Sequence, residues 1–266
     1  MTRRLVTFLA TSFAITWSAW GVLILLARTR TAAYGEWPFM ALYILGGLGP
    51  TIGAYVAVLA TSTLAPLSEF HRRLLRWRVS GWWYLIAVGL PIGLAIVSTL
   101  IATWLSPDLS GALSFQPWYM LPLLFLMMIL GGGLEELGWR GVAQPELGRT
   151  IGHARAALSV GFIWAIWHAP LFLIPSVSQY RTNFLVFAIG VIGTALTLGW
   201  LYSCTESILL CVIFHAAGNA IAIFGFVISR EAGWLALMAP CLNVLVGSVL
   251  LSRIQHKPAL AVRSCS

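Results

Sequence analysis

The chain contains eight apolar segments of about 20 residues, and this feature limits its fold more than any other. A transmembrane helix needs roughly 20 apolar residues, whereas a strand of a transmembrane barrel needs about 10 residues of alternating polarity. The sequence therefore predicts an all-α fold, a polytopic transmembrane bundle of about eight helices. The expected spans are about 5–27, 39–63, 81–104, 118–142, 156–174, 183–203, 207–228 and 234–252.

The composition leads to the same fold class. Hydrophobic residues make up 59% of the chain and charged residues 9%, too few polar groups to cover the surface of a soluble domain of this size. The connections between the apolar segments are short, so we expect a single membrane domain over residues 1–266. The apolar segment that starts at Leu5 is too long for a signal peptide, which favours a retained first span.

The net charge of +8 does not indicate nucleic-acid binding, because the basic residues lie at the ends of the apolar segments. They are concentrated in the connections that share a side with the N-terminus, which predicts that both termini are cytoplasmic. The largest contribution comes from the basic amphipathic segment at residues 71–78, interpreted as an interfacial segment that contacts anionic headgroups. The short loops favour the inner membrane of a bacterium.

Glu135, Glu136 and Arg140 lie inside an apolar segment and require an explanation. A charged side chain at the centre of a bilayer costs roughly 2.5–3.5 kcal/mol. Glu136 and Arg140 are four residues apart on one helix face and can pair, whereas Glu135 points about 100° away. Two carboxylates this close do not ionise independently, which favours one of them as a proton acceptor.

Two further apolar segments carry polar groups: Trp164 and His168 in one, His215 and Asn219 in the other. Each alone has a structural interpretation, since a membrane histidine or asparagine can hydrogen-bond across a helix interface. Together they indicate a functional site. A carboxylate and a histidine can deprotonate water, and a second histidine with an asparagine amide can stabilise an oxyanion. This set predicts peptide-bond hydrolysis inside the membrane by water.

These residues resemble the motifs of the CPBP family of intramembrane proteases, also called the Abi or type II CAAX prenyl endopeptidase family. Residues 135–140, Glu-Glu-Leu-Gly-Trp-Arg, match the pattern E-E-x-x-x-R, and residues 215–219, His-Ala-Ala-Gly-Asn, match H-x-x-x-N. In the remaining motif, F-x-x-x-H, Trp164 stands where the family usually has Phe. The resemblance covers residues 40–222 or so.

The resemblance implies that Glu135 and His168 activate the water, and that His215 and Asn219 stabilise the oxyanion. Glu136, Arg140 and Trp164 would support the geometry of the site. The substrate would be a membrane-associated peptide or protein. Neither the natural substrate nor the oligomeric state follows from the sequence.

Two alternatives remain open at this stage. Glu135, His168 and His215 could form a His₂Glu zinc site, but Asn219 is a poor zinc ligand, so metal-independent catalysis without a cofactor is favoured. The chain could also be a non-proteolytic transporter or a scaffold or immunity protein, because intramembrane charges mark transport pathways as well. The inverted repeats typical of transporters are not evident.

Overall fold

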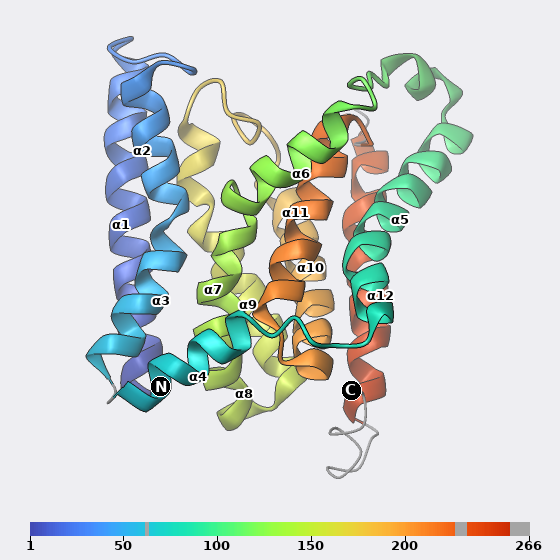
Figure 1. The fold of residues 1–266 in the computed structure, drawn as a ribbon. Helices are drawn as coiled ribbons and strands as arrows, with labels where there is room; N and C mark the ends of the chain where they lie inside the picture. Colours follow the sequence, from blue (N-terminus) through green and yellow to red (C-terminus); the bar gives the residue numbers. More distant parts are fainter. Residues whose placement is uncertain (62–63, 227–232, 256–266) are drawn as a thin grey trace.

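The computed structural model describes residues 1–61, 64–226 and 233–255, and every regular element within them is helical (Figure 1). The all-α prediction is therefore confirmed. The α-helices are α1 (Arg3–Arg28), α2 (Trp37–Gly47), α3 (Gly49–Ala60), α4 (Leu64–Leu74), α5 (Gly81–Leu105), α6 (Met120–Leu130), α7 (Glu136–Gly138), α8 (Gln144–Ile151), α9 (His153–Trp167), α10 (Phe184–Thr205), α11 (Ile208–Phe224) and α12 (Met238–Gln255). Short 3₁₀ turns η1 (Pro107–Ala112), η2 (Gly133–Glu135), η4 (Ala169–Leu173) and η5 (Gly233–Leu237) and the π-helical turn η3 (Trp139–Ala143) connect them.

Among the described residues, six helical runs are long and apolar enough to cross a membrane, so the protein is an integral, multi-pass membrane protein. The predicted span 39–63 is a pair, α2 and α3, bent by 45°, and its last two residues lie outside the described residues. The span predicted at 207–228 is the shorter apolar helix α11, and residues 227–228 are likewise not described. The end predicted for the fourth span is wrong: the helical run that starts at Met120 continues to Ile151.

The bend between α2 and α3 follows from the sequence Gly46-Gly-Leu-Gly-Pro50. A Cβ atom on Gly46 would lie 2.1 Å from Trp20 Nε1, and one on Gly49 would lie 2.1 Å from Thr16 Oγ1. These two glycines therefore let the bent pair approach α1. The Thr16 hydroxyl uses this proximity to donate a hydrogen bond of 2.7 Å to the Gly46 carbonyl.

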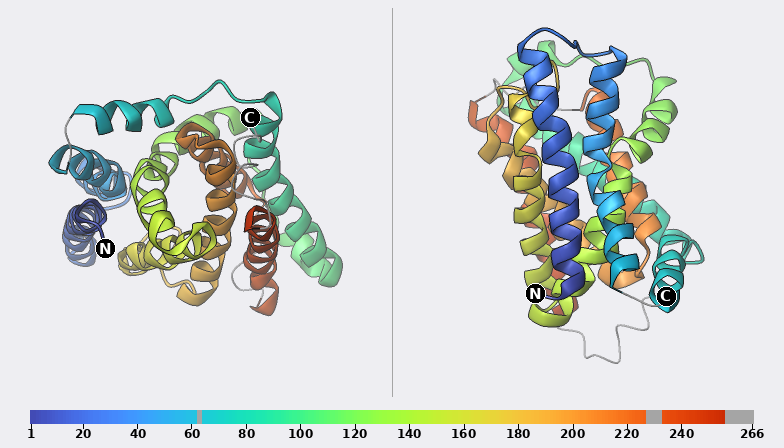
Figure 2. Two further views of the ribbon diagram at one scale, coloured as in Figure 1. Left: turned by 90° about the horizontal axis from the view of Figure 1, so that it is seen from below. Right: turned by 90° about the vertical axis from the view of Figure 1, so that its left-hand side faces the viewer.

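Tryptophan side chains fill the centre of the bundle and position the run from α6 to α8. Trp139 and Trp167 are fully buried. The rings of Phe8 on α1 and Trp139 meet edge to face with centroids 5.4 Å apart, and Trp167 Nε1 donates to Thr16 Oγ1 at 2.9 Å. Seen end-on, the run from α6 to α8 lies between the α1–α3 side and α11 (Figure 2).

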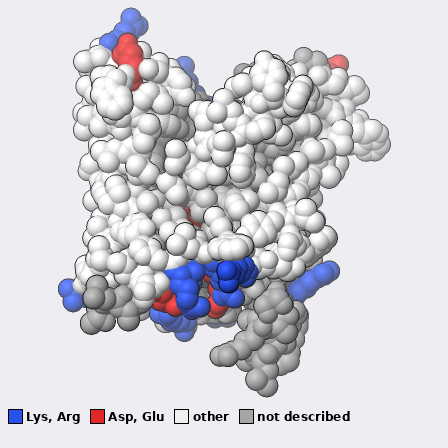
Figure 3. All heavy atoms as spheres, viewed as in Figure 1, with Lys and Arg blue, Asp and Glu red and all other residues white. Residues whose placement is uncertain are grey.

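The end of the bundle at which α1 begins and α12 ends is called the basic end (Figure 1). Lysine and arginine side chains gather there along α4, whereas the band above is nearly free of charge (Figure 3). Two of these arginines bind the bundle itself: Arg73 Nη2 donates to the Gly141 carbonyl at 3.1 Å, and Arg76 forms an ion pair of 2.8 Å with Glu206. The predicted contact with headgroups thus remains a prediction for Arg72 and Arg78, which are exposed.

Candidate active site

The segment with the two glutamates is not a regular helix. Helix α6 ends at Leu130, and Gly131-Gly-Gly133 leads into the 3₁₀ turn η2, which ends at Glu135. A Cβ on Gly133 would lie 3.0 Å from both the side chain and the carbonyl oxygen of Val212 on α11. The glycines therefore break the helix and bring its backbone against α11.

Glu136, Arg140 and His215 form a buried ionic cluster. Glu136 Oε2 lies 2.9 Å from Arg140 Nη1, and both side chains are 0% exposed. Glu136 Oε1 lies 2.9 Å from His215 Nδ1. The Arg140 guanidinium also donates to the Ala195 carbonyl at 3.2 Å and lies over the Trp164 ring, 5.1 Å from its centroid. The pair predicted from the four-residue spacing is thus present, although the backbone changes to a π-helical turn at Trp139.

Glu135 lies apart from the Glu136–Arg140 pair. Its Oε2 atom accepts a hydrogen bond of 2.7 Å from the indole Nε1 of Trp164, and the residue is 8% exposed. In Figure 3, acidic atoms are visible in a recess of the otherwise uncharged band. One carboxylate is therefore held by a cation and the other by a neutral N–H group, and this difference separates the two adjacent glutamates chemically.

His168 follows the last residue of α9, and its hydrogen bond fixes its tautomer. Its Nδ1 atom lies 2.9 Å from the backbone carbonyl oxygen of Trp164. A carbonyl only accepts, so Nδ1 carries the proton, and Nε2 of the neutral ring bears a lone pair. The ring is packed edge to face against Trp167 and Phe187 at 4.7 and 5.1 Å between centroids. His168 is thus oriented as a base through Nε2.

His215 and Asn219 converge on the backbone of Gly132. A Cβ built on that glycine would lie 2.5 Å from Asn219 Nδ2 and 3.2 Å from His215 Nε2. These two nitrogen atoms lie on one face of α11, four residues apart, as the sequence predicted. Three segments that are distant in sequence therefore meet: η2 with α7, the end of α9, and α11.

Trp164 contacts Glu135, His168 and His215 and is the residue whose role the sequence underestimated. Its indole N–H binds Glu135, its carbonyl binds His168, and its ring meets the His215 ring edge to face at 5.2 Å between centroids. One indication of this role was visible in the sequence: position 164 carries Trp, where the family motif usually has Phe. Only the indole of Trp adds a hydrogen-bond donor there.

The π-helical turn that carries Arg140 has an external hydrogen-bond donor that the sequence did not indicate. Pro145 lacks an N–H group, so it cannot bond the Gly141 carbonyl four residues earlier. Arg73 on α4 donates to that carbonyl instead. The Phe70 ring packs on the same glycine, where a Cβ would lie 2.6 Å from its Cε2 atom. The basic segment therefore supports the turn that presents Arg140.

Among the described residues, no three His, Cys, Asp or Glu side chains converge as a metal-binding group. The described geometry of Glu135, His168 and His215 is therefore not that of a His₂Glu zinc site.

Comparison with known proteins matches the middle of the chain to a protein family and part of the chain to a curated relative. Residues 117–221 match the family model "Type II CAAX prenyl endopeptidase Rce1-like". The chain is also 32% identical over 113 residues to the CAAX prenyl protease 2 of Methanococcus maripaludis. This alignment covers 40% of the chain and 41% of the length of that relative. All the candidate residues, from Glu135 to Asn219, lie within the range of the family model.

Proposed function

We propose that the chain is an intramembrane endopeptidase of the CPBP family, because residues 117–221 match the type II CAAX prenyl endopeptidase model. It would hydrolyse a peptide bond of a membrane-associated protein or peptide with water as the nucleophile. The observation that carries this proposal is the separation of Glu135 from the Glu136–Arg140 pair. This separation occurs next to Gly132, whose backbone His215 and Asn219 face. A purely structural ion pair would not need a second carboxylate.

In the proposed first step, Glu135 and His168 position the water and remove its proton. Trp164 holds Oε2 of Glu135, so Oε1 is the oxygen that faces the water. The lone pair on His168 Nε2 accepts the second hydrogen bond. The water oxygen attacks the carbonyl carbon while its proton moves to the Glu135 carboxylate. The products of this step are a tetrahedral oxyanion and a neutral Glu135.

His215 and Asn219 are the proposed donors to this oxyanion. Glu136 pairs with Arg140 as a carboxylate, which only accepts, so His215 Nδ1 donates to it. A neutral His215 would then present a lone pair at Nε2, and only the doubly protonated ring can donate to an oxyanion there. Asn219 Nδ2 donates in either case. We therefore assign the imidazolium form to His215 during catalysis.

The charges of the cluster are compatible with this assignment. Ionised Glu135 and Glu136 balance Arg140 and a protonated His215, so the resting site has no net charge. When the proton of the water moves to Glu135, the negative charge moves to the oxyanion next to His215. The sum is unchanged, which avoids an uncompensated charge in a low-dielectric interior. The C–N bond then breaks, and the proton on Glu135 passes to the leaving amine nitrogen.

The name of the archaeal relative suggests the substrate to test first. That name, CAAX prenyl protease 2, points to a prenylated peptide that ends in a CaaX sequence. We propose that the N-terminus faces the cytoplasm of a bacterial cell, which places the basic end on that side. Fluorescent-protein fusions at each terminus test this orientation, because the proposal requires both fusions to be protected from protease added outside.

The decisive experiment compares Glu135→Gln with Glu36→Gln in protein reconstituted into lipid nanodiscs. Glu36 is exposed, and its carboxylate only accepts from the Ala33 N–H, so it is a matched control. Loss of the general base lowers peptide cleavage by about 10²–10⁴-fold, while Glu36→Gln retains full activity. Equal activity of wild type and Glu135→Gln would contradict the proposed mechanism, whereas absence of cleavage by the wild type would favour a scaffold or transporter.

A further inference from the structure

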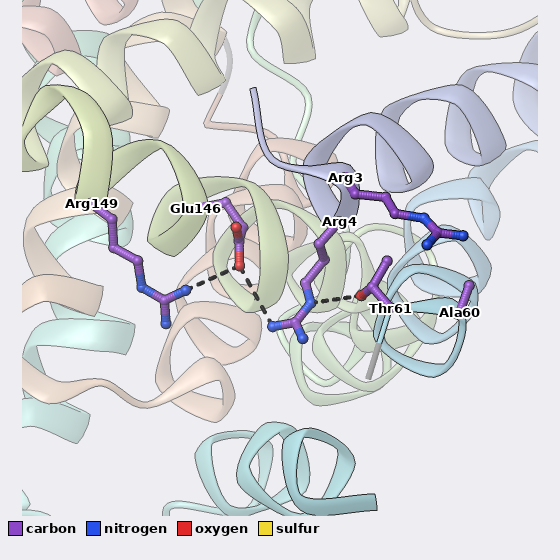
Figure 4. A pocket seen from close by; sticks show the side chains of 6 residues that line it. All are labelled: Arg3, Arg4, Ala60, Thr61, Glu146 and Arg149. Atoms are coloured by element: carbon purple, nitrogen blue, oxygen red, sulfur yellow. Dashed lines mark hydrogen bonds and ion pairs between the residues drawn. The ribbon is translucent and has the colours of Figure 1, made fainter. Parts of the chain in front are cut away.

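A pocket at the basic end, separate from the candidate active site, is lined by three arginines. It has a volume of about 350 Å³ and lies between the start of α1, the end of α3 and helix α8 (Figure 4). The lining residues are Arg3, Arg4, Ala60, Thr61, Glu146 and Arg149. None of these residues takes part in the proposed hydrolysis.

The pocket carries an excess of positive charge that its own carboxylate does not balance. Oε1 of Glu146 is shared by two guanidinium groups, at 3.2 Å from Arg149 Nη1 and 3.5 Å from Arg4 Nη1. The Arg3 guanidinium points away from Glu146 and from Arg149 (Figure 4). Two cations contact the carboxylate and Arg3 is a third cation in the lining, so the lining carries two more positive than negative formal charges.

The polar wall of the pocket is held in place before any ligand binds. Thr2 donates its hydroxyl to Glu146 Oε2 at 2.7 Å, and the Glu146 side chain is only 7% exposed. Arg4 Nε donates to Thr61 Oγ1 at 3.1 Å. Arg149, by contrast, is 73% exposed. One fixed and two exposed guanidinium groups suit an anion that arrives from outside the protein.

Exposed apolar side chains continue from the pocket toward the middle of the bundle. Val6 lies one helical turn beyond Arg3 on the same face of α1 and is 49% exposed. Val56 lies one turn before Ala60 on α3, and the neighbouring Leu59 is 58% exposed. The site thus combines a cationic head region with an adjoining apolar strip, which is the polarity of a phospholipid.

We propose that this pocket binds the phosphate group of an anionic phospholipid, with the acyl chains along Val6, Val56 and Leu59. Arginine forms paired, charge-assisted hydrogen bonds with phosphate oxygens, and the negative headgroups of a membrane surface lie at this depth. The sequence pointed instead to the α4 segment as the basic headgroup contact. Arg73 and Arg76 in that segment are engaged by protein groups, whereas Arg72 and Arg78 are exposed, so the pocket is proposed as a headgroup site in addition to that segment.

The test uses the full chain in detergent and measures its thermal unfolding midpoint against added lipid. Short-chain phosphatidylglycerol, short-chain phosphatidylcholine and inorganic phosphate are titrated separately. The double variant Arg3→Ala/Arg149→Ala is compared with Arg28→Ala/Arg30→Ala, which removes two exposed arginines at the other end of α1. All four substitutions replace exposed side chains, so we expect each variant to fold.

We expect phosphatidylglycerol to raise the midpoint of the wild type more than phosphatidylcholine does. Each basic residue near an anionic surface contributes about fivefold in affinity. The concentration for half of the effect should therefore rise about 25-fold in Arg3→Ala/Arg149→Ala, about fivefold in Arg3→Ala, and not at all in the control. The proposal is wrong if the control variant loses as much affinity, if phosphatidylcholine is as effective, or if inorganic phosphate protects at the same concentration as the lipid.

Discussion

The Glu136–Arg140–His215 cluster and the Arg4–Glu146–Arg149 cluster use similar groups in opposite surroundings. In the first, Glu136 and Arg140 are 0% exposed and each charge has a specific partner. In the second, Glu146 is nearly buried, but Arg149 is 73% exposed and the cations outnumber the carboxylate. Burial requires that charges balance, whereas an exposed edge tolerates an excess that can attract a ligand. The first arrangement suits fixed catalytic geometry and the second suits binding.

A comparison of the unfolding free energies of Arg140→Gln and Arg149→Gln tests this contrast. It has the largest expected effect on stability. Loss of Arg140 leaves Glu136 buried and uncompensated, which should lower the free energy of unfolding by about 3–5 kcal/mol. The same change at Arg149 should cost less than about 1 kcal/mol, because exposed ion pairs contribute little. Denaturant unfolding in detergent measures both. Similar losses for the two variants would show that burial does not separate the clusters.

Gly132→Ala should break the catalytic cluster without breaking the fold. The new Cβ would meet the end of the Asn219 side chain, which can move, but only away from its proposed position as an oxyanion donor. Loss of one such donor costs about 10²–10³-fold in kcat. Gly89→Ala in α5 is the control, because its Cβ would meet no atom within 4 Å. Full activity of Gly132→Ala would remove Asn219 from the mechanism.

Trp164→Phe should have a smaller effect, because it deletes one hydrogen bond and keeps an aromatic ring. Hydrogen bonds to charged groups contribute about 1.5–3 kcal/mol, so kcat should fall by roughly 10- to 100-fold. KM should stay constant, since in the proposed arrangement Trp164 holds Glu135 rather than the substrate. Steady-state kinetics on the CaaX peptide separate the two constants. A change confined to KM would instead place Trp164 in substrate binding.

The smallest expected effect concerns metal removal. Since the described His, Cys, Asp and Glu side chains do not converge as a metal site, we expect treatment with a chelator such as EDTA or 1,10-phenanthroline to leave the cleavage rate unchanged. The measurement compares treated protein before and after added zinc. Loss of activity to the chelator with recovery on zinc would restore the alternative site of Glu135, His168 and His215.

The periodicity of polar residues was enough to predict one ion pair of the candidate site. The four-residue spacing of Glu136 and Arg140 predicted their ion pair, which forms across a change from α-helix to π-helix because both geometries keep such residues on nearly one face. The same spacing placed His215 and Asn219 together. The spacing of polar residues did not predict that the helix is broken just before Glu135. The sequence Gly131-Gly-Gly133 is compatible with either a packed helix or an interrupted one.

The sequence by itself determined the all-α membrane fold and the residues that carry its buried charge, because long apolar segments and polar residues at helical spacing depend only on local order along the chain. Only the tertiary structure decided which partner each group has: Trp164 for Glu135, His215 for Glu136, and Arg73 for the carbonyl that Pro145 leaves without a donor. The arginine pocket, too, appears only where the ends of α1 and α3 meet α8. Such contacts join residues far apart in the sequence, and packing of the whole bundle selects them.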